Sequence, residues 1–76
     1  MRIYSVEVVL PNGIKAMYRN GGLDATLRLL RGEGANITMD HVWALASLSY
    51  GLSYAFKSRR VQYTVSCTKY ICEPDG

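Results

Sequence analysis

The chain has 76 residues, of which 49% are hydrophobic and 20% are charged, and its net charge is +3. This length suits one small domain, and the composition is too apolar for a disordered protein. The sequence therefore predicts a single folded domain over residues 1–76. The mild basic excess favours encounters with acidic partners without identifying one.

The N-terminal residues and the overall hydropathy indicate the compartment. Residues 1–13 read MRIYSVEVVLPNG, in which Ser5 and Glu7 interrupt the continuous apolar run of a signal peptide. No segment reaches the roughly 18 apolar residues of a membrane span. We therefore expect a cytoplasmic protein that does not bind a membrane.

The two cysteines, Cys67 and Cys72, are too few for a disulfide scaffold. A bridge between them would require a turn near Tyr70, because extended chain would hold their Cα atoms about 16 Å apart. A zinc site normally needs four ligands, and the chain offers two cysteines and one histidine. We expect two inert thiols, whose redox state the sequence leaves open, and no metal or cofactor.

Residues 2–19 predict a β-hairpin. Pro11 cannot donate the hydrogen bond of a two-residue Asn-Gly turn, so a type I turn at Pro11 and Asn12, followed by a Gly13 bulge, fits better. That turn pairs Leu10 with Ile14. The register then pairs Val8 with Ala16 and Val6 with Tyr18, and the apolar face holds Tyr4, Val6, Val8, Leu10, Ile14, Ala16 and Tyr18.

Two helices and a third strand are expected to follow. Leucines recur at helical spacing over residues 23–31, and Gly32 is a natural stop. Thr38 is a good N-cap for a second helix over residues 39–57, in which Gly51 costs about 1 kcal/mol relative to alanine. Residues 61–70 alternate as a strand, and residues 72–76 form a loose tail. The predicted fold is α+β, a three-stranded antiparallel sheet in ββααβ order with both helices packed on one face.

The predicted helix over residues 39–57 has an aliphatic side and an aromatic side. At about 100° per residue, Trp43, Tyr50 and Tyr54 fall within about 40° of one another. The aliphatic stripe lies nearly opposite and comprises Val42, Leu45, Leu48, Leu52 and Phe56. The aromatic stripe is either covered by the first helix or the tail, as core, or exposed as a protein-binding ridge, since tryptophan and tyrosine are enriched at interface hot spots. A homodimer through the same ridge is a version of the second alternative.

The basic run Lys57, Ser58, Arg59 and Arg60 follows the aromatic residues. At a helix C-terminus these cations would offset the helix dipole. Alternatively, Lys57, Arg59 and Arg60 join the tyrosines in a surface that binds the phosphates and bases of RNA or single-stranded DNA. A helix-turn-helix is not supported, because the periodicity of the second helix continues where a turn would be needed.

The residues offer no catalytic set. His41 is the only histidine, and it points about 100° away from Asp40 on a helix, so the two do not form a base and its orienting carboxylate. The Gly-rich segment over residues 31–36 lacks the Walker pattern and a preceding strand. We therefore expect a protein that is not an enzyme.

In overall profile the chain resembles the small accessory proteins with which phages and mobile elements disable host machinery, anti-CRISPR proteins among them. The shared features are a small self-contained domain, no catalytic set, and an aromatic surface at Trp43, Tyr50 and Tyr54. The resemblance implies a non-enzymatic inhibitor that occludes a host protein or protein complex through this ridge and the flanking Lys57, Arg59 and Arg60. The alternative is a small basic nucleic-acid-binding protein that uses the same residues.

Overall fold

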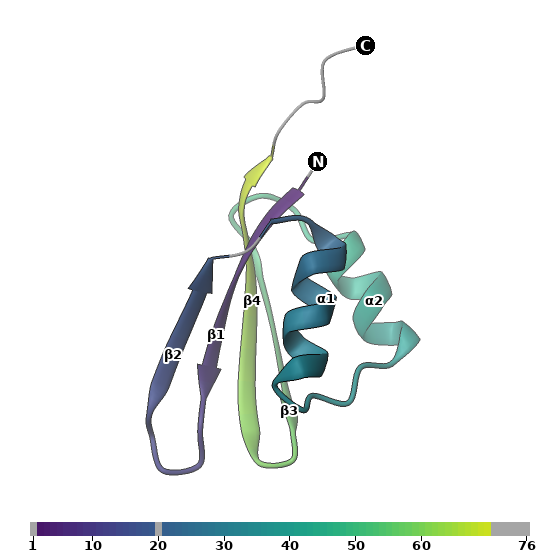
Figure 1. Ribbon diagram of the computed structural model, residues 1–76. Coiled ribbons are helices and arrows are strands. Elements are labelled where there is room, and N and C mark those ends of the chain that lie inside the picture. Colours follow the sequence, from purple (N-terminus) through teal and green to yellow (C-terminus); the bar gives the residue numbers. More distant parts are fainter. Residues whose placement is uncertain (1, 20, 71–76) are drawn as a thin grey trace.

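The sheet of the protein has four antiparallel strands in the spatial order β2-β1-β4-β3, and both helices lie on one of its faces (Figure 1). The computed structural model describes residues 2–19 and 21–70. The elements, in chain order, are β1 (Arg2–Val9), β2 (Lys15–Arg19), α1 (Leu23–Gly32), α2 (Met39–Ala46), β3 (Ser53–Ser58) and β4 (Val61–Tyr70). The α+β class and the two helices on one face are as expected. The prediction of three strands in ββααβ order was wrong, because the order is ββααββ.

The first hairpin forms with the predicted turn and register. Leu10 donates its backbone N–H to Ile14 O at 2.9 Å, Gly13 donates to Leu10 O at 2.9 Å, and Gly13 has a φ of 87°. Val8 pairs with Ala16. The predicted apolar face is only partly buried, because the hairpin tip projects past the helices and leaves Leu10 and Ile14 exposed (Figure 1).

The predicted strand over residues 61–70 is confirmed as β4, and it lies in the middle of the sheet. It pairs with β1, with Val65 opposite Val6, as expected for a third strand beside the hairpin. Its other edge pairs with β3, where Tyr63 lies opposite Phe56. The alternation of β4 therefore reflects one face buried under the helices, with Tyr63 and Val65 at the centre of the core.

The predicted helix over residues 39–57 was wrong in its second half. Helix α2 ends at Ala46, Gly51 adopts a φ of 83° in the following loop, and residues 53–58 form β3. Serine, tyrosine, phenylalanine and glycine are poorer helix formers than alanine, and tyrosine and phenylalanine favour strands. In β3 the side chains of Tyr54 and Phe56 turn toward the helices, while those of Ser53 and Ala55 are exposed. Pairing with β4 thus places these two rings, partly buried, against the core.

The core lies between the sheet and the two helices. The buried side chains of the sheet are Tyr4, Val6, Val8, Tyr63, Val65 and Cys67, and those of the helices and loops include Leu27, Leu30, Ala35, Leu45 and Leu48. Of the expected aliphatic stripe on the second helix, Leu45 and Leu48 are buried, whereas Leu52 is exposed in a loop and Phe56 belongs to β3. The core is therefore complete without the aromatic residues of the predicted ridge, except Tyr54, which packs against it.

Two buried tyrosines fasten the helix ends to the sheet. Tyr4 of β1 donates its hydroxyl to Leu45 O, in the last turn of α2, at 2.6 Å. Tyr63 of β4 donates to Glu33 O, just after α1, at 3.3 Å. The last carbonyl groups of a helix have no partner within its regular hydrogen-bond pattern, so they are free to accept bonds from the sheet. Leu45 O accepts from the Leu48 N–H as well as from Tyr4.

Within the part of the chain that the structure describes, no helix has the length and apolar character to cross a membrane. The expected loose tail, 72–76, and Cys72 lie outside the described residues. Cys67 is buried in the core.

Candidate functional site

Helix α2 carries two large apolar side chains on its outer side. Met39 and Trp43 are 66% and 68% exposed and lie four residues apart, which places them on one face of the helix. The opposite side of α2 buries Leu45 completely. We call Met39 and Trp43 together the α2 surface.

The N-terminus of α2 is held by a capping box that also fixes the helix on the sheet. The backbone N–H of His41 donates to Thr38 Oγ1 at 3.4 Å, and the backbone N–H of Thr38 donates to His41 Nδ1 at 3.1 Å. The His41 ring stacks on Phe56 of β3, with 4.4 Å between ring centroids. The predicted N-cap at Thr38 is therefore confirmed, and His41 serves to position α2 and its exposed surface.

The three aromatic residues of the predicted ridge do not form one surface. Trp43 lies on α2, Tyr50 lies in the loop before β3, and Tyr54 lies on β3. Tyr50 is 69% exposed, but Tyr54 packs against the core with its ring 6.2 Å from that of His41. The ridge was wrong because it required a continuous helix from Trp43 to Tyr54, and that helix ends at Ala46.

The basic run does not cap a helix. Lys57 lies near the end of β3, and Arg59 and Arg60 form the two-residue turn between β3 and β4. Both arginines have positive φ, 51° and 68°. The backbone N–H of Asn36 donates to Ser58 Oγ at 3.0 Å, which ties the loop between α1 and α2 to the end of β3. The predicted flank of the ridge is therefore a separate basic hairpin tip.

Two exposed residues, Met39 on α2 and Lys15 on β2, were not among the predicted site residues. Met39 could have been found from the sequence, because it lies one helical turn before Trp43. Lys15 could not, because its place in one row across the sheet with Lys57 depends on the strand order.

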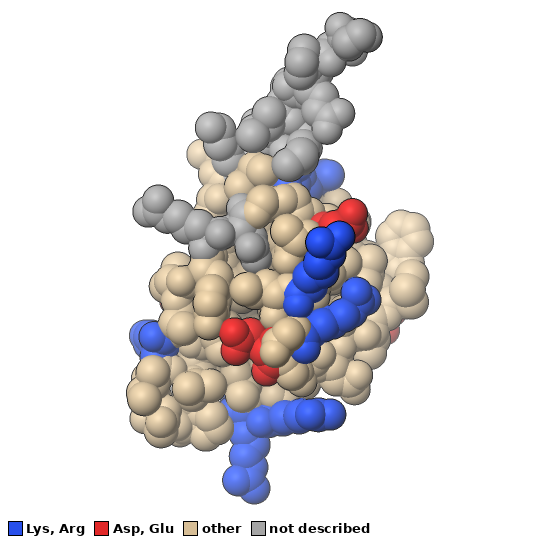
Figure 2. Space-filling view, viewed as in Figure 1, with Lys and Arg blue, Asp and Glu red and all other residues tan. Residues whose placement is uncertain are grey.

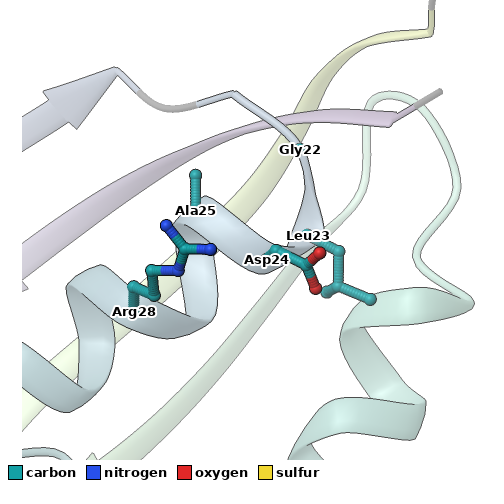
Figure 3. A pocket seen from close by; sticks show the side chains of 5 residues that line it. All are labelled: Gly22, Leu23, Asp24, Ala25 and Arg28. Carbon is teal, nitrogen blue, oxygen red and sulfur yellow. The ribbon is translucent and has the colours of Figure 1, made fainter.

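A concave site lies at the start of α1 (Figure 3). Its volume is about 420 Å³, and it is lined by Gly22, Leu23, Asp24, Ala25 and Arg28. The lining offers one carboxylate and one guanidinium, both on the first two turns of the same helix (Figure 3). Among residues 2–19 and 21–70, no group of three or more His, Cys, Asp or Glu side chains is placed to hold a metal ion.

Glu33, at the end of α1, raises the pKa values of two nearby tyrosines, Tyr18 and Tyr63. Its carboxylate accepts a hydrogen bond from the Tyr18 hydroxyl at 2.9 Å, and this bond raises the pKa of Tyr18. The pKa of Tyr63 is also raised, mainly by burial and further by the charge of Glu33. These tyrosines stay neutral at physiological pH and act as hydrogen-bond donors, so they join β2 and β4 to the end of α1.

Comparison of the chain with protein-family models, with curated proteins and with solved structures finds no match.

Proposed function

We propose that the chain is a non-enzymatic protein of the cytoplasm that binds a partner protein through the α2 surface and acts by occluding the partner's own binding site. The observation that carries this proposal is the exposure of Trp43 on a helix whose other side buries Leu45 in the core. The overall resemblance to small phage inhibitors agrees with such a role. The partner would then be a host protein or protein complex.

The exposed side chains supply enough apolar area for an interface hot spot. Burial of the exposed share of a tryptophan contributes roughly 3–4 kcal/mol at about 25 cal/mol per Å². Met39 adds a flexible apolar side chain one turn away, which adapts its shape to a pocket. Neither residue belongs to the core, so both are available for binding without a cost to the fold.

A foreign partner suits the α2 surface better than a second copy of the chain. A symmetric dimer would place two convex surfaces against each other, and Met39 and Trp43 together offer far less than the roughly 800 Å² per partner of a stable interface. A partner with a concave apolar pocket can enclose Trp43 and add contacts from its rim. We therefore assign the α2 surface to a partner protein with such a pocket.

Site-specific photocrosslinking tests the proposal. A benzophenone amino acid replaces Met39 in one variant and Met17 in the control, because Met17 is similarly exposed, at 64%, but lies on β2. The probe at position 39 should give one discrete adduct with a cellular protein. Unlabelled wild-type protein should compete for the adduct, and the Trp43→Ala variant should not.

Three outcomes would contradict the proposal. Adducts of equal yield at positions 39 and 17 would mean nonspecific contact. An adduct with a second copy of the chain would mean a homodimer. Competition by Trp43→Ala as effective as that by wild type would remove Trp43 from the interface.

A further inference from the structure

The two hairpin tips lie side by side at one end of the sheet (Figure 1). The strand register fixes this placement. Val9, the last residue of β1, lies opposite both Lys15 of β2 and Gln62 of β4, and Gln62 lies opposite Lys57 of β3. Lys15, Val9, Gln62 and Lys57 therefore form one row across the sheet, next to the Arg59-Arg60 turn.

This row points away from the helices. The face of β1 that packs against α1 and α2 carries Tyr4, Val6 and Val8, so Val9 and the residues directly opposite it lie on the other face. Lys15 and Lys57 thus share the open face, with their Cα atoms about 14 Å apart over three strand spacings. Both side chains are exposed.

The turn between β3 and β4 places two arginines at strained backbone positions. A two-residue hairpin turn with positive φ at both positions is normally made by Asn-Gly or Gly-containing pairs. Here Arg59 and Arg60 take these positions, although side chains other than those of Gly and Asn are strained there. Basic side chains project from the end of the molecule where this hairpin lies (Figure 2). Strained residues at an exposed tip point to binding.

The charge balance of this end is positive. Lys15, Lys57, Arg59 and Arg60 gather here, and we call them the basic end. The carboxylate of the open face, Glu7, lies two residues back along β1 from Val9. Glu33, at the end of α1, accepts from the Tyr18 hydroxyl, which is neutral and does not offset the charge of the carboxylate. Four cations thus face two carboxylates at this end.

From this arrangement we infer that the basic end binds the phosphate backbone of double-stranded nucleic acid. Its cations are spread in two dimensions, across the sheet and at the tip, which matches the phosphates of a duplex surface. The open face beside them carries Gln62, Thr64 and Ser66, side chains of the kinds that bond to phosphate and sugar. None of the described side chains of the open face is aromatic, whereas single-strand binders stack bases on aromatic rings. This site is separate from the α2 surface and is tested independently of it.

Fluorescence anisotropy with a labelled 20-base-pair DNA duplex tests the inference, with the same sequence as RNA duplex and as single strand in parallel. Four phosphate contacts predict a slope of log K against log salt of about −3.6, which is a loss of about 150-fold between 50 and 200 mM salt. The Arg59→Asn, Arg60→Gly double variant should reduce the slope to about −1.8 and the loss to about 12-fold. It should also keep the hairpin, because Asn-Gly suits the turn.

The matched control removes the same charge from a helix. Arg28→Gln with Arg31→Gln changes two exposed cations of α1 and should leave the slope for the duplex unchanged. Four outcomes would overturn the inference. They are no duplex binding at 50 mM salt, an equal loss in the α1 control, tighter binding of the single strand than of either duplex, and tighter binding of anionic lipid vesicles than of duplex at equal phosphate concentration.

Discussion

At the scale of single residues, buried hydroxyl groups hold the helices on the sheet. Tyr4 is 1% exposed, and its hydroxyl donates to Leu45 O. Leu45 O also accepts from the Leu48 N–H at 3.2 Å, so Tyr4→Phe removes one buried hydrogen bond without leaving this carbonyl unpaired. The variant should therefore reduce the free energy of unfolding by about 1 kcal/mol in urea titrations. Trp43→Ala, at an exposed position outside the core, should change it by less than about 0.5 kcal/mol. If both variants lost the same free energy of unfolding, the burial of Tyr4 and the exposure of Trp43 would be contradicted.

The raised pKa of Tyr4 predicts that the stability of the protein falls at alkaline pH. Burial raises the pKa of Tyr4 above its usual value of 10.0, although Arg2 opposes this shift. The unfolded chain therefore ionises first as the pH rises, so the stability linked to Tyr4 is complete below about pH 10 and is lost as the pH rises through the folded pKa. Urea titrations at pH 8 and above pH 10 should show a decline that is shallower in Tyr4→Phe. An identical decline in both proteins would exclude Tyr4 as a cause.

His41 combines two contacts that substitutions can separate. His41→Ala removes both the acceptor for the Thr38 N–H and the ring stacked on Phe56, and it should cost about 1–2 kcal/mol of unfolding free energy. His41→Gln retains a side-chain acceptor at the third helical position and should cost about half as much. Urea unfolding of the two variants measures the difference. Equal losses would mean that the capping bond contributes nothing.

At the scale of elements, the strand β3 is the main departure from the sequence-based expectation. Ala55 lies on its exposed side, opposite Thr64 of β4. A β-branched residue favours a strand and disfavours a helix, so Ala55→Thr should stabilise the protein by a few tenths of a kcal/mol. Chemical denaturation detects this gain when several replicates are averaged. A loss of stability would support a helix over residues 53–58 instead.

The first hairpin and the start of α2 were predictable because turn or cap residues mark them in the sequence. The hairpin of β3 and β4 was not. Pro11, Asn12 and Gly13 specify the first turn and its register, and Thr38 marks the start of α2. The second hairpin has no such signal, because Arg59 and Arg60 replace the glycine or asparagine of a two-residue turn. Leu45, Leu48, Leu52 and Phe56 also recur at helical spacing, so the pattern favoured a continuous helix. The continuous ridge depended on that helix, and of its three aromatic residues Trp43 and Tyr50 are exposed, whereas Tyr54 packs against the core.

The turn between β3 and β4 offers a direct measure of its strain. Replacement of Arg59 and Arg60 by Asn and Gly removes two side chains from left-handed backbone, where each costs about 1–2 kcal/mol. The double variant should therefore be more stable, with a gain of about 1–2 kcal/mol after the higher entropy of unfolded glycine is counted. Thermal unfolding followed by circular dichroism measures the gain. A less stable variant would mean that the arginines make compensating contacts.

At the scale of the whole molecule, the two proposed binding surfaces lie in separate places. The α2 surface lies on the outer side of the helical layer, whereas the basic end lies at the tips of both hairpins. A small protein with both surfaces could contact a protein and a nucleic acid in one complex without either contact blocking the other. The α2 surface should therefore bind its partner with little dependence on salt, in contrast to the basic end.

The proposed function requires that Trp43 is exposed on the folded protein and can insert into a pocket of the partner. The most direct test is the fluorescence of this single tryptophan, measured as emission wavelength and as acrylamide quenching at two protein concentrations. We predict red-shifted emission and strong quenching at both concentrations. Blue-shifted, protected emission at both concentrations would place Trp43 in the core, and protection that disappears on dilution would place it in a homodimer interface. Either result would contradict the account.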